Sequence, residues 1–387
     1  MKVGIFSDVF YPYLLGGGEN RYYEVARKLA LLGDKVTVVT TALRGSAGHE
    51  EPFPGVEIFR GGWPRHPLTH RSLASIPGYM AWASGATRKV EDSDILDLNT
   101  YASAIVGLSV ARKLKKPVVV TVHDVFASSW LDGHNLLYGL LGTFSERLIA
   151  WLDRDGAILT VSEATKRKIV ETLRFDERRV FVVPNGVDSA TLRALAHRTP
   201  RQKEPRRIIY VGRLIGYKNV DHLLQIVRKL EQTGPSVSLD VVGAGDELAR
   251  LQALSKKLGV EQKVRFHGFI EDKREVFGLV AQADVLVNPS YFEGFGMSLL
   301  EALAVGTPVV AYGLDAYKEF LADRSNCLLA ERGHLEQLTD AVRTILVDDD
   351  LAHRLVAQGL RIAAGFDWMN VARRIREVYT TVIHELT

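Results

Sequence analysis

Short apolar runs alternate with amphipathic stretches along this chain. In the first half, four apolar runs have the length of buried strands: residues 3–6, 36–39, 118–122 and 158–161. An amphipathic stretch at residues 19–32 separates the first two runs and has apolar positions at helical spacing. Such an alternation is typical of a parallel sheet whose strands are joined by crossover helices.

The alternation starts again after a charged segment. Residues 197–207 hold two prolines and show no apolar period, which indicates a linker. Five more strand-like runs follow it, at residues 207–211, 238–242, 264–266, 285–287 and 308–311. They predict a second doubly wound sheet. Apolar residues also recur at helical spacing in the last stretch, 368–385. The second sheet offers this helix no partner, so we expect it to cross back to the first domain.

The length of the chain agrees with two domains. At 387 residues it exceeds the roughly 250 to 300 residues that one hydrophobic core organises. We predict two Rossmann-like α/β domains that face each other across a cleft. The first comprises residues 1–195 plus 368–387, and the second comprises residues 206–367. Ligands of open parallel sheets bind beyond the carboxyl ends of the strands, so the chemistry is expected in the strand-to-helix turns.

Composition excludes several classes of protein. The single cysteine, Cys327, can form no internal disulfide and no thiol cluster for a metal, which favours a reducing cytoplasm. A net charge of +3 without a basic stripe argues against nucleic acid as a partner. No apolar run reaches the 18 residues of a spanning helix, and Asp8 interrupts the apolar N-terminal stretch. We expect a cytoplasmic protein with at most peripheral membrane contact.

The segment 289–302, PSYFEGFGMSLLEA, carries the most specific chemistry. It places Glu293 and Glu301 on either side of a strand–glycine–helix junction. Gly294 and Gly296 exclude one continuous helix and allow the backbone to approach a ligand closely. A helix that begins near Gly296 directs its free N–H groups and positive dipole end at a ligand, which suits a diphosphate. Glu301 would then lie about 7 to 8 Å further along the axis, near a ribose, with Glu293 beside a sugar.

This segment resembles the signature of the family 4 glycosyltransferases of the GT-B fold, E-G-F-G-x-x-x-x-E. A second motif of that family, G-R-x-x-x-x-K-[GN], is matched by residues 212–219, GRLIGYKN. The resemblance extends over nearly the whole chain. It implies a retaining hexosyltransferase that moves a sugar from a nucleotide diphosphate-sugar to a carbohydrate, lipid-linked or small-molecule acceptor. It also implies that Arg213 and Lys218 hold the diphosphate in place of a metal, since two fixed cations can stabilise the leaving phosphate.

The same resemblance implies the rest of the donor site. The turn 242–246 and residues 267–270 occupy the places where the family forms its nucleoside pocket. Phe269 and Ile270 contact the base in one interpretation and pack in the core in the other. The donor-binding residues that we expect are Gly17, Gly18, Gly243, Phe269, Ile270, Gly294, Phe295, Gly296 and Glu301.

The acceptor side begins at the first strand-to-helix turn, residues 16–18. This glycine loop is not a dinucleotide fingerprint, because the third glycine of G-x-G-x-x-G is replaced by Arg21. The resemblance assigns it to a close approach of the backbone to the donor phosphate and the acceptor. His123 ends a strand, where similar proteins have a histidine that reaches the transferred sugar; it could also be structural. The catalytic residues that we expect are His123, Arg213, Lys218 and Glu293.

Two further patterns have competing interpretations. The D-x-D sequences at residues 92–94 and 153–155 match metal-dependent transferases but precede strands, at the wrong end of a sheet for a site. We predict no metal and no other cofactor. The aromatic stretches 63–82 and 126–151, the second with Arg147, either pack against the first sheet or contact a membrane surface.

The resemblance implies front-face attack, in which the departing phosphate takes the acceptor proton. A nucleotide-sugar epimerase of the same fold and a silent nucleotide-sugar-binding subunit remain as alternatives. Specificity depends on the shape of the pocket, so the sequence leaves open the donor base, the sugar, the acceptor and the oligomeric state.

Overall fold

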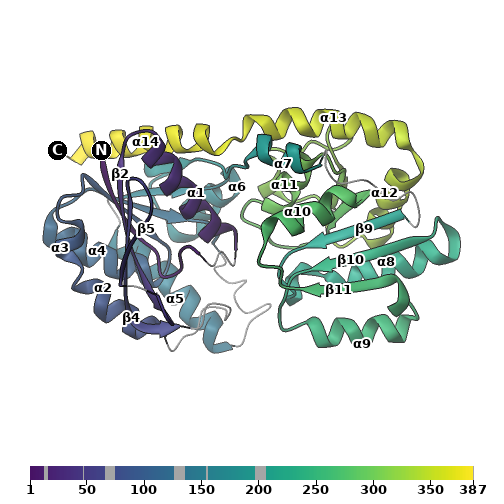
Figure 1. The fold of residues 1–387 in the computed structure, drawn as a ribbon, viewed down its shortest axis with the longest axis horizontal. Helices are drawn as coiled ribbons and strands as arrows, with labels where there is room; N and C mark the ends of the chain where they lie inside the picture. Colours follow the sequence, from purple (N-terminus) through teal and green to yellow (C-terminus); the bar gives the residue numbers. More distant parts are fainter. Residues whose placement is uncertain are drawn as a thin grey trace. The chain divides into compact units, whose positions relative to one another are not determined.

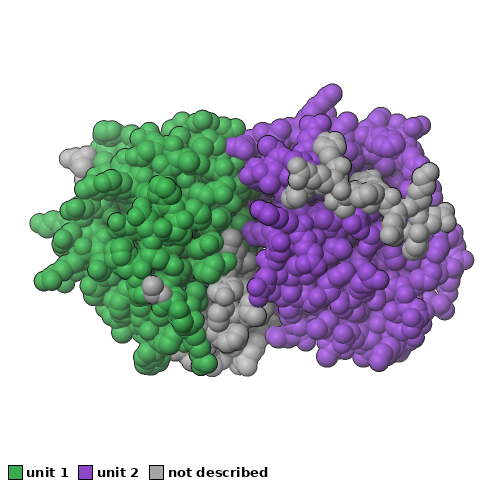
Figure 2. Space-filling model, viewed as in Figure 1, with its two compact units in different colours: residues 1–186, 368–387 green, residues 187–367 purple. Residues whose placement is uncertain are grey.

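The computed structural model describes residues 1–12, 16–46, 48–65, 75–125, 136–153, 156–196 and 206–386. Most of the predicted linker and part of one D-x-D sequence lie outside these ranges. So do residues 66–74 of the first predicted aromatic stretch and residues 126–135 of the second. The described chain divides into two compact units: unit 1 comprises 1–186 and 368–387, and unit 2 comprises 187–367 (Figure 2).

Unit 1 is built on an eight-stranded sheet in the order β3-β4-β2-β1-β5-β6-β7-β8. All neighbouring strands run parallel except β3, which pairs antiparallel with β4 at one edge. The strands are β1 (Lys2–Phe6), β2 (Lys35–Leu43), β3 (His49–Phe53), β4 (Val56–Arg65), β5 (Ile95–Asn99), β6 (Val118–Val122), β7 (Ala157–Thr160) and β8 (Val180–Val182). The helices are α1 (Gly17–Leu31), α2 (Ile76–Ser84), α3 (Thr87–Val90), α4 (Ala102–Leu114), α5 (Leu136–Leu152), α6 (Glu163–Leu173) and α14 (Trp368–Leu386).

Unit 2 holds a six-stranded, fully parallel sheet in the order β11-β10-β9-β12-β13-β14. The strands are β9 (Arg206–Val211), β10 (Val237–Val242), β11 (Val264–Gly268), β12 (Val285–Asn288), β13 (Val309–Tyr312) and β14 (Leu328–Ala330). The helices are α7 (Ser189–Ala196), α8 (Val220–Thr233), α9 (Leu248–Leu258), α10 (Lys273–Gln282), α11 (Met297–Val305), α12 (Leu335–Val347) and α13 (Asp349–Gly365). This is the 3-2-1-4-5-6 order of a dinucleotide-binding sheet, whose direction of progression reverses between β9 and β12.

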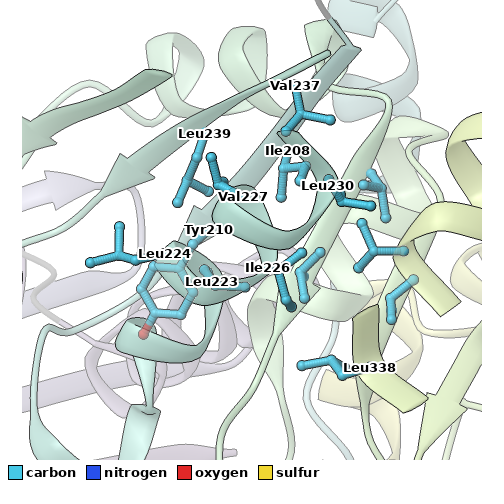
Figure 3. Close-up of a cluster of buried hydrophobic side chains, with 14 of the residues drawn as sticks. Ile208, Tyr210, Leu223, Leu224, Ile226, Val227, Leu230, Val237, Leu239 and Leu338 are labelled. Carbon is cyan, nitrogen blue, oxygen red and sulfur yellow. The ribbon is translucent and has the colours of Figure 1, made fainter. Parts of the chain in front are cut away.

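The packing of the core of unit 2 explains why its strands have apolar residues at successive positions in the sequence. Ile208 and Tyr210 of β9 pack with Leu223, Val227 and Leu230 of α8, all of them buried (Figure 3). Helices cover both faces of a doubly wound sheet, so a central strand needs apolar residues on both sides. A helix needs them only on the side that faces the sheet.

The last helix, α14, belongs to unit 1, as the sequence predicted. It lies alongside α1 (Figure 1). The guanidinium group of Arg376 donates to both carboxylate oxygens of Asp34, at 3.2 and 3.0 Å, and Tyr379 donates to Asp97 in β5. The buried apolar side of α14 thus has its partner in the first sheet.

The first boundary between the units differs from the prediction, which placed it after residue 195. The described units divide between Gly186 and Val187, so α7 belongs to unit 2. Helix α7 packs against α10 and α11, and the hydroxyl of Ser189 donates to the carbonyl of Ala363 in α13 at 3.0 Å. The prediction placed the boundary at the charged segment 197–207, but the chain already packs on unit 2 before that segment.

Candidate active site

Loops from β9 and β12 meet at the point where the strand order of unit 2 reverses. The backbone N–H of Tyr291 donates to the carbonyl of Tyr217 at 2.9 Å, and the side chain of Asn219 donates to the carbonyl of Pro289 at 3.1 Å. Open parallel sheets bind their ligands at such a switch point. The topology therefore brings together the two motifs that the sequence singled out, 212–219 and 289–302.

Lys218 and Glu293 form an ion pair at this switch point. Both side chains are largely buried, at 10% and 17% exposure. Burial alone would raise the pKa of the Glu293 carboxyl, but the charge of Lys218 and the hydrogen bonds that it receives hold this pKa below its ordinary value. Glu293 is therefore an anion at neutral pH, and its counter-ion is the lysine predicted to bind phosphate.

The hydrogen bonds to Glu293 converge on one of its two oxygens. Lys218, Asn288 at 3.3 Å and Ser290 at 3.1 Å all donate to Oε1. From the residues that the structure describes, Oε2 receives no hydrogen bond. An ionised carboxylate has about four acceptor positions, so Glu293 keeps acceptor capacity for the hydroxyl groups of a ligand.

Arg213 lies in the same loop and is exposed. Its guanidinium group donates to the hydroxyl of Tyr217 at 3.0 Å, and its carbonyl accepts from the hydroxyl of Tyr210 at 2.9 Å. The hydroxyl of Tyr217 thus orients the side chain, and because this partner is neutral it does not neutralise the charge of the guanidinium group.

Gly243 holds the loops after β9 and β10 together. A Cβ atom at Gly243 would lie 1.9 Å from the carbonyl oxygen of Gly212, and one at Gly245 would lie 2.1 Å from that of Leu214. The φ angle of Gly243 is +139°, which strongly favours glycine. These glycines are required by the packing of one loop on another, a reason that the sequence did not suggest.

The E-G-F-G segment turns the chain from β12 into α11. Gly296 has a φ of +94° and precedes the first helical residue, and a Cβ atom there would lie 2.6 Å from the ring of Tyr317. The side chain of Phe295 is buried against Phe320 and Phe366, with ring centroids 5.0 and 6.2 Å away. The structure thus places the Phe295 side chain in an aromatic cluster, although the sequence assigned this residue to the donor.

Glu301 lies in the second turn of α11 and is half-buried. Burial raises its pKa to about 7, against the opposing charge of Lys273 at the start of α10. Among the described residues it has no hydrogen-bond donor. Hydrogen bonds from the hydroxyl groups of a ligand would stabilise the ionised form of such a half-buried carboxyl group.

Phe269 and Ile270 follow β11 at the carboxyl end of the sheet. Phe269 is 44% exposed and Ile270 is half-buried, so the interpretation that placed Phe269 in the core is wrong. Gly268 has a φ of +71° and ends the strand just before them. An exposed aromatic ring at this edge of the sheet is available to stack on a base.

In unit 1, the predicted glycine loop and His123 lie side by side. The helix α1 begins at Gly17, and a Cβ atom at Gly18 would lie 3.1 Å from both Cδ2 and Nε2 of His123. The histidine ring also meets the ring of Tyr22 edge-on, with centroids 6.0 Å apart. The glycine at position 18 therefore permits the close contact between α1 and His123.

The D-x-D sequence at 92–94 is tied to the first strand. Asp94 accepts from the backbone N–H of Lys2 at 2.7 Å, and Asp92 pairs with the Lys2 ammonium at 3.5 Å. Both lie before β5, at the amino end of the sheet. In the described ranges, no group of three or more His, Cys, Asp or Glu residues is arranged to hold a metal ion.

Within those ranges, no helix has the length and apolar character needed to cross a membrane.

The sequence missed several residues that hold the site together. Asn288 and Ser290 orient Glu293, and the only available signal was the placing of polar residues directly after a buried strand. Asp97, which binds Tyr22 and Tyr379, carried no signal because these partners lie 75 and 282 residues away along the chain.

Comparisons with known proteins agree with this arrangement. A family model for glycosyl transferases group 1 matches residues 194–361, and one for glycosyltransferase family 4 matches residues 15–191. The phosphatidyl-myo-inositol mannosyltransferase of Mycobacterium leprae is 30% identical over 394 residues, which cover 99% of this chain and 97% of that protein.

Solved structures share the fold over the full length. Sucrose-phosphate synthase from Thermosynechococcus elongatus matches with a TM-score of 0.84 at 20% identity, covering 99% of both chains. The Anabaena protein HepE in complex with UDP-glucose matches with a TM-score of 0.76 at 20% identity, covering 98% of this chain and 100% of the other. The two parallel-sheet units are those of the GT-B fold. The chain belongs to the family 4 glycosyltransferases, which confirms the resemblance seen in its motifs.

Proposed function

We propose that this glycosyltransferase retains anomeric configuration and moves a hexose from a nucleoside diphosphate-sugar, bound by unit 2, to an acceptor bound by unit 1. One observation carries the proposal: a buried cation, Lys218, is paired with a carboxylate, Glu293, at the switch point of the sheet. The cation suits a phosphate and the carboxylate suits sugar hydroxyls. The UDP-glucose bound to HepE supports this type of donor.

Unit 2 provides the groups that hold the diphosphate. An ammonium group carries three N–H donors, so Lys218 can donate to Glu293 and to a phosphate oxygen together. Arg213, exposed in the same loop, adds a second cation. The N-terminus of α11 adds backbone donors and a positive dipole end. Together these groups stabilise the negative charge that grows on the leaving phosphate.

The transfer proceeds on one face of the sugar. The bond between the anomeric carbon and the phosphate oxygen breaks, and the acceptor oxygen forms its bond to the same face. The acceptor proton passes to the departing phosphate oxygen, so no further base is needed. A short-lived cationic sugar lies between the two steps, and the Glu293 anion favours it electrostatically. His123 lies beside the glycine loop of unit 1 and contacts the transferred sugar.

The nucleoside lies between α11 and the end of β11 in this proposal. The Glu301 carboxylate accepts hydrogen bonds from the ribose hydroxyls, which gives this poorly solvated group donors that the described part of the chain does not supply. Phe269 stacks on the base, with Ile270 beside it. Gly243 acts indirectly, by keeping the loop after β10 against the phosphate-binding loop.

The reaction needs no metal or other cofactor in this proposal, because Arg213 and Lys218 supply the positive charge. The test is transfer from a panel of nucleoside diphosphate-hexoses in excess EDTA, with the anomeric configuration of the product read by NMR. Retained configuration and undiminished transfer are expected. Inversion, or loss with EDTA and rescue by manganese, would overturn the proposal. Release of epimerised free sugar without a labelled acceptor product would favour the epimerase alternative.

We also propose that unit 1 contacts an anionic membrane surface, where a lipid-linked acceptor would be found. Phe144 and Trp151 of α5 are 64% and 72% exposed, and exposed Arg147 lies between them on the same side of the helix. These exposed rings do not pack on the sheet. Arg112 of α4 donates to the carbonyl of Leu152, which joins the end of α5 to a stretch that holds the basic residues Arg112, Lys113, Lys115 and Lys116. Aromatic rings beside cations are typical of a surface that binds anionic lipid headgroups.

A further inference from the structure

Asp97 is the centre of a buried hydrogen-bond network in unit 1. It lies in β5 and is 3% exposed. Its Oδ1 accepts from the hydroxyls of Tyr22 and Thr121, both at 2.8 Å, and its Oδ2 accepts from the hydroxyl of Tyr379. Three elements of the fold, α1, β6 and α14, therefore converge on one carboxyl group.

Two partners of Asp97 hold the surroundings of His123. Thr121 precedes the histidine by two residues at the end of β6. Tyr22 meets the imidazole ring edge-on, and the backbone of Gly18, one turn earlier in α1, lies against the same ring. The carboxyl group thus fixes both the strand that carries His123 and the helix that the histidine ring contacts.

Arg21, whose charge interacts with that of Asp97, holds the chain where it leaves unit 1. Arg21 donates through Nη1 to the carbonyl of Pro184 at 3.0 Å and to Oδ1 of Asn185 at 2.9 Å, just before unit 2 begins. Burial lowers the pKa of Arg21 to about 10, and the charge of Asp97 is the main influence that opposes this shift. Tyr379 anchors the returning helix on the same carboxyl group.

We propose that Asp97 is a positioning residue for His123, and that the C-terminal helix completes the active site by donating the Tyr379 hydroxyl to it. The proposal rests on the proposed role of His123 in transfer. It assigns α14 a part in catalysis in addition to its packing on the first sheet. The nucleoside diphosphate part of the donor is bound by unit 2 in the proposed function, so loss of the network should lower kcat and leave the affinity for the bare nucleoside diphosphate unchanged.

The test compares two tyrosine-to-phenylalanine variants of the full chain. Tyr379→Phe removes only the hydroxyl group that donates a hydrogen bond to Asp97. Tyr79→Phe is the matched control, because this hydroxyl is also buried in unit 1 and donates to Ser103 at 3.2 Å, away from Asp97. We expect kcat to fall about tenfold in Tyr379→Phe, with an unchanged affinity for the nucleoside diphosphate, and to stay near the wild-type value in Tyr79→Phe.

A second measurement is independent of activity. The imidazole Cε1–Hε1 NMR signal of His123, assigned with His123→Gln, should move in Tyr379→Phe and in Tyr22→Phe and stay in place in Tyr79→Phe. A folded Tyr379→Phe protein with wild-type kcat and an unmoved signal would overturn the proposal, as would equal losses in both variants. Wild-type kcat in His123→Gln would instead refute the role of His123 in transfer. The NMR signal would still report whether Asp97 positions the ring.

Discussion

Three groups among the described residues donate hydrogen bonds to Glu293, all to Oε1, and the ammonium group of Lys218 is one of them. The two residues are 75 positions apart in the sequence and come from loops on either side of the topological switch point. This pair therefore couples the proposed phosphate-binding loop to the proposed sugar-binding loop.

Replacement of Glu293 by glutamine should separate sugar recognition from nucleotide binding. Glutamine can present its oxygen to the same three donors, but it places an NH₂ group where Oε2 lies. A sugar hydroxyl then loses a charged acceptor, worth roughly 1.5 to 3 kcal/mol. We expect transfer to fall at least about tenfold, with nearly unchanged affinity for the nucleoside diphosphate by calorimetry. Equal loss of nucleotide affinity would contradict the assignment of Glu293 to the sugar.

Glu301→Ala should behave in the opposite way. Its proposed partners are the ribose hydroxyls, which belong to the nucleotide itself. Affinity for the bare nucleoside diphosphate should weaken by roughly 1.5 to 3 kcal/mol, measured by the same calorimetry. Wild-type affinity in Glu301→Ala would exclude a contact with the ribose.

Lys218→Ala should lower turnover at least tenfold, which corresponds to about 1.4 kcal/mol of barrier. The variant removes charge from the leaving phosphate and also leaves Glu293 without its counter-ion. The pKa of Glu293 should therefore rise. Lys256→Ala, at an exposed position of α9, is the control and should keep wild-type turnover. Wild-type turnover in both variants would make Lys218 a structural cation only.

Glu301 should also make the free energy of unfolding depend on pH in the absence of ligand. Its pKa in the folded protein is about 7, above the ordinary 4.5, so folding favours the neutral acid. The free energy of unfolding therefore decreases as pH rises from 4.5 to 7, and stays lower at higher pH. The glutamine side chain of Glu301→Gln is always neutral. The melting temperature of this variant should therefore exceed that of the wild type at about pH 8 and equal it at about pH 4.5. Exposed Glu261→Gln is the control, and a wild-type melting curve for Glu301→Gln at both pH values would contradict the burial argument.

The exposed side of α5 predicts selective binding to anionic vesicles. Replacement of Phe144 and Trp151 by alanine should lower partitioning onto phosphatidylglycerol vesicles at least about tenfold in a sedimentation assay, because each ring contributes roughly 1.5 to 3 kcal/mol when buried. Leu31→Ala, which alters a 67% exposed side chain of α1, should have no effect. Equal binding of wild type and double variant, or equal binding to phosphatidylcholine, would refute the proposed contact.

Several features could be predicted from the pattern of residues along the chain. The return of the last helix to the first domain followed from its apolar spacing and from the absence of a partner in the second sheet. The junction between β12 and α11 followed from two glycines between a strand-like run and a helical one. The environment of the Phe295 side chain could not be predicted in this way. Its ring lies in a cluster with Phe320 and Phe366, which are distant in the sequence.

The sequence by itself determined the alternation of strands and helices, the positions of the glycine turns and the types of charged residue near them, since period and backbone freedom are local properties. Only the tertiary structure decided which of these residues meet. The strand order joins Lys218 to Glu293, and the packing of α14 joins Tyr379 to Asp97 across 282 residues. Such contacts depend on the order in which strands pair and on the side that each helix buries. Both are settled by the free energy of the whole core, which no local stretch of sequence encodes.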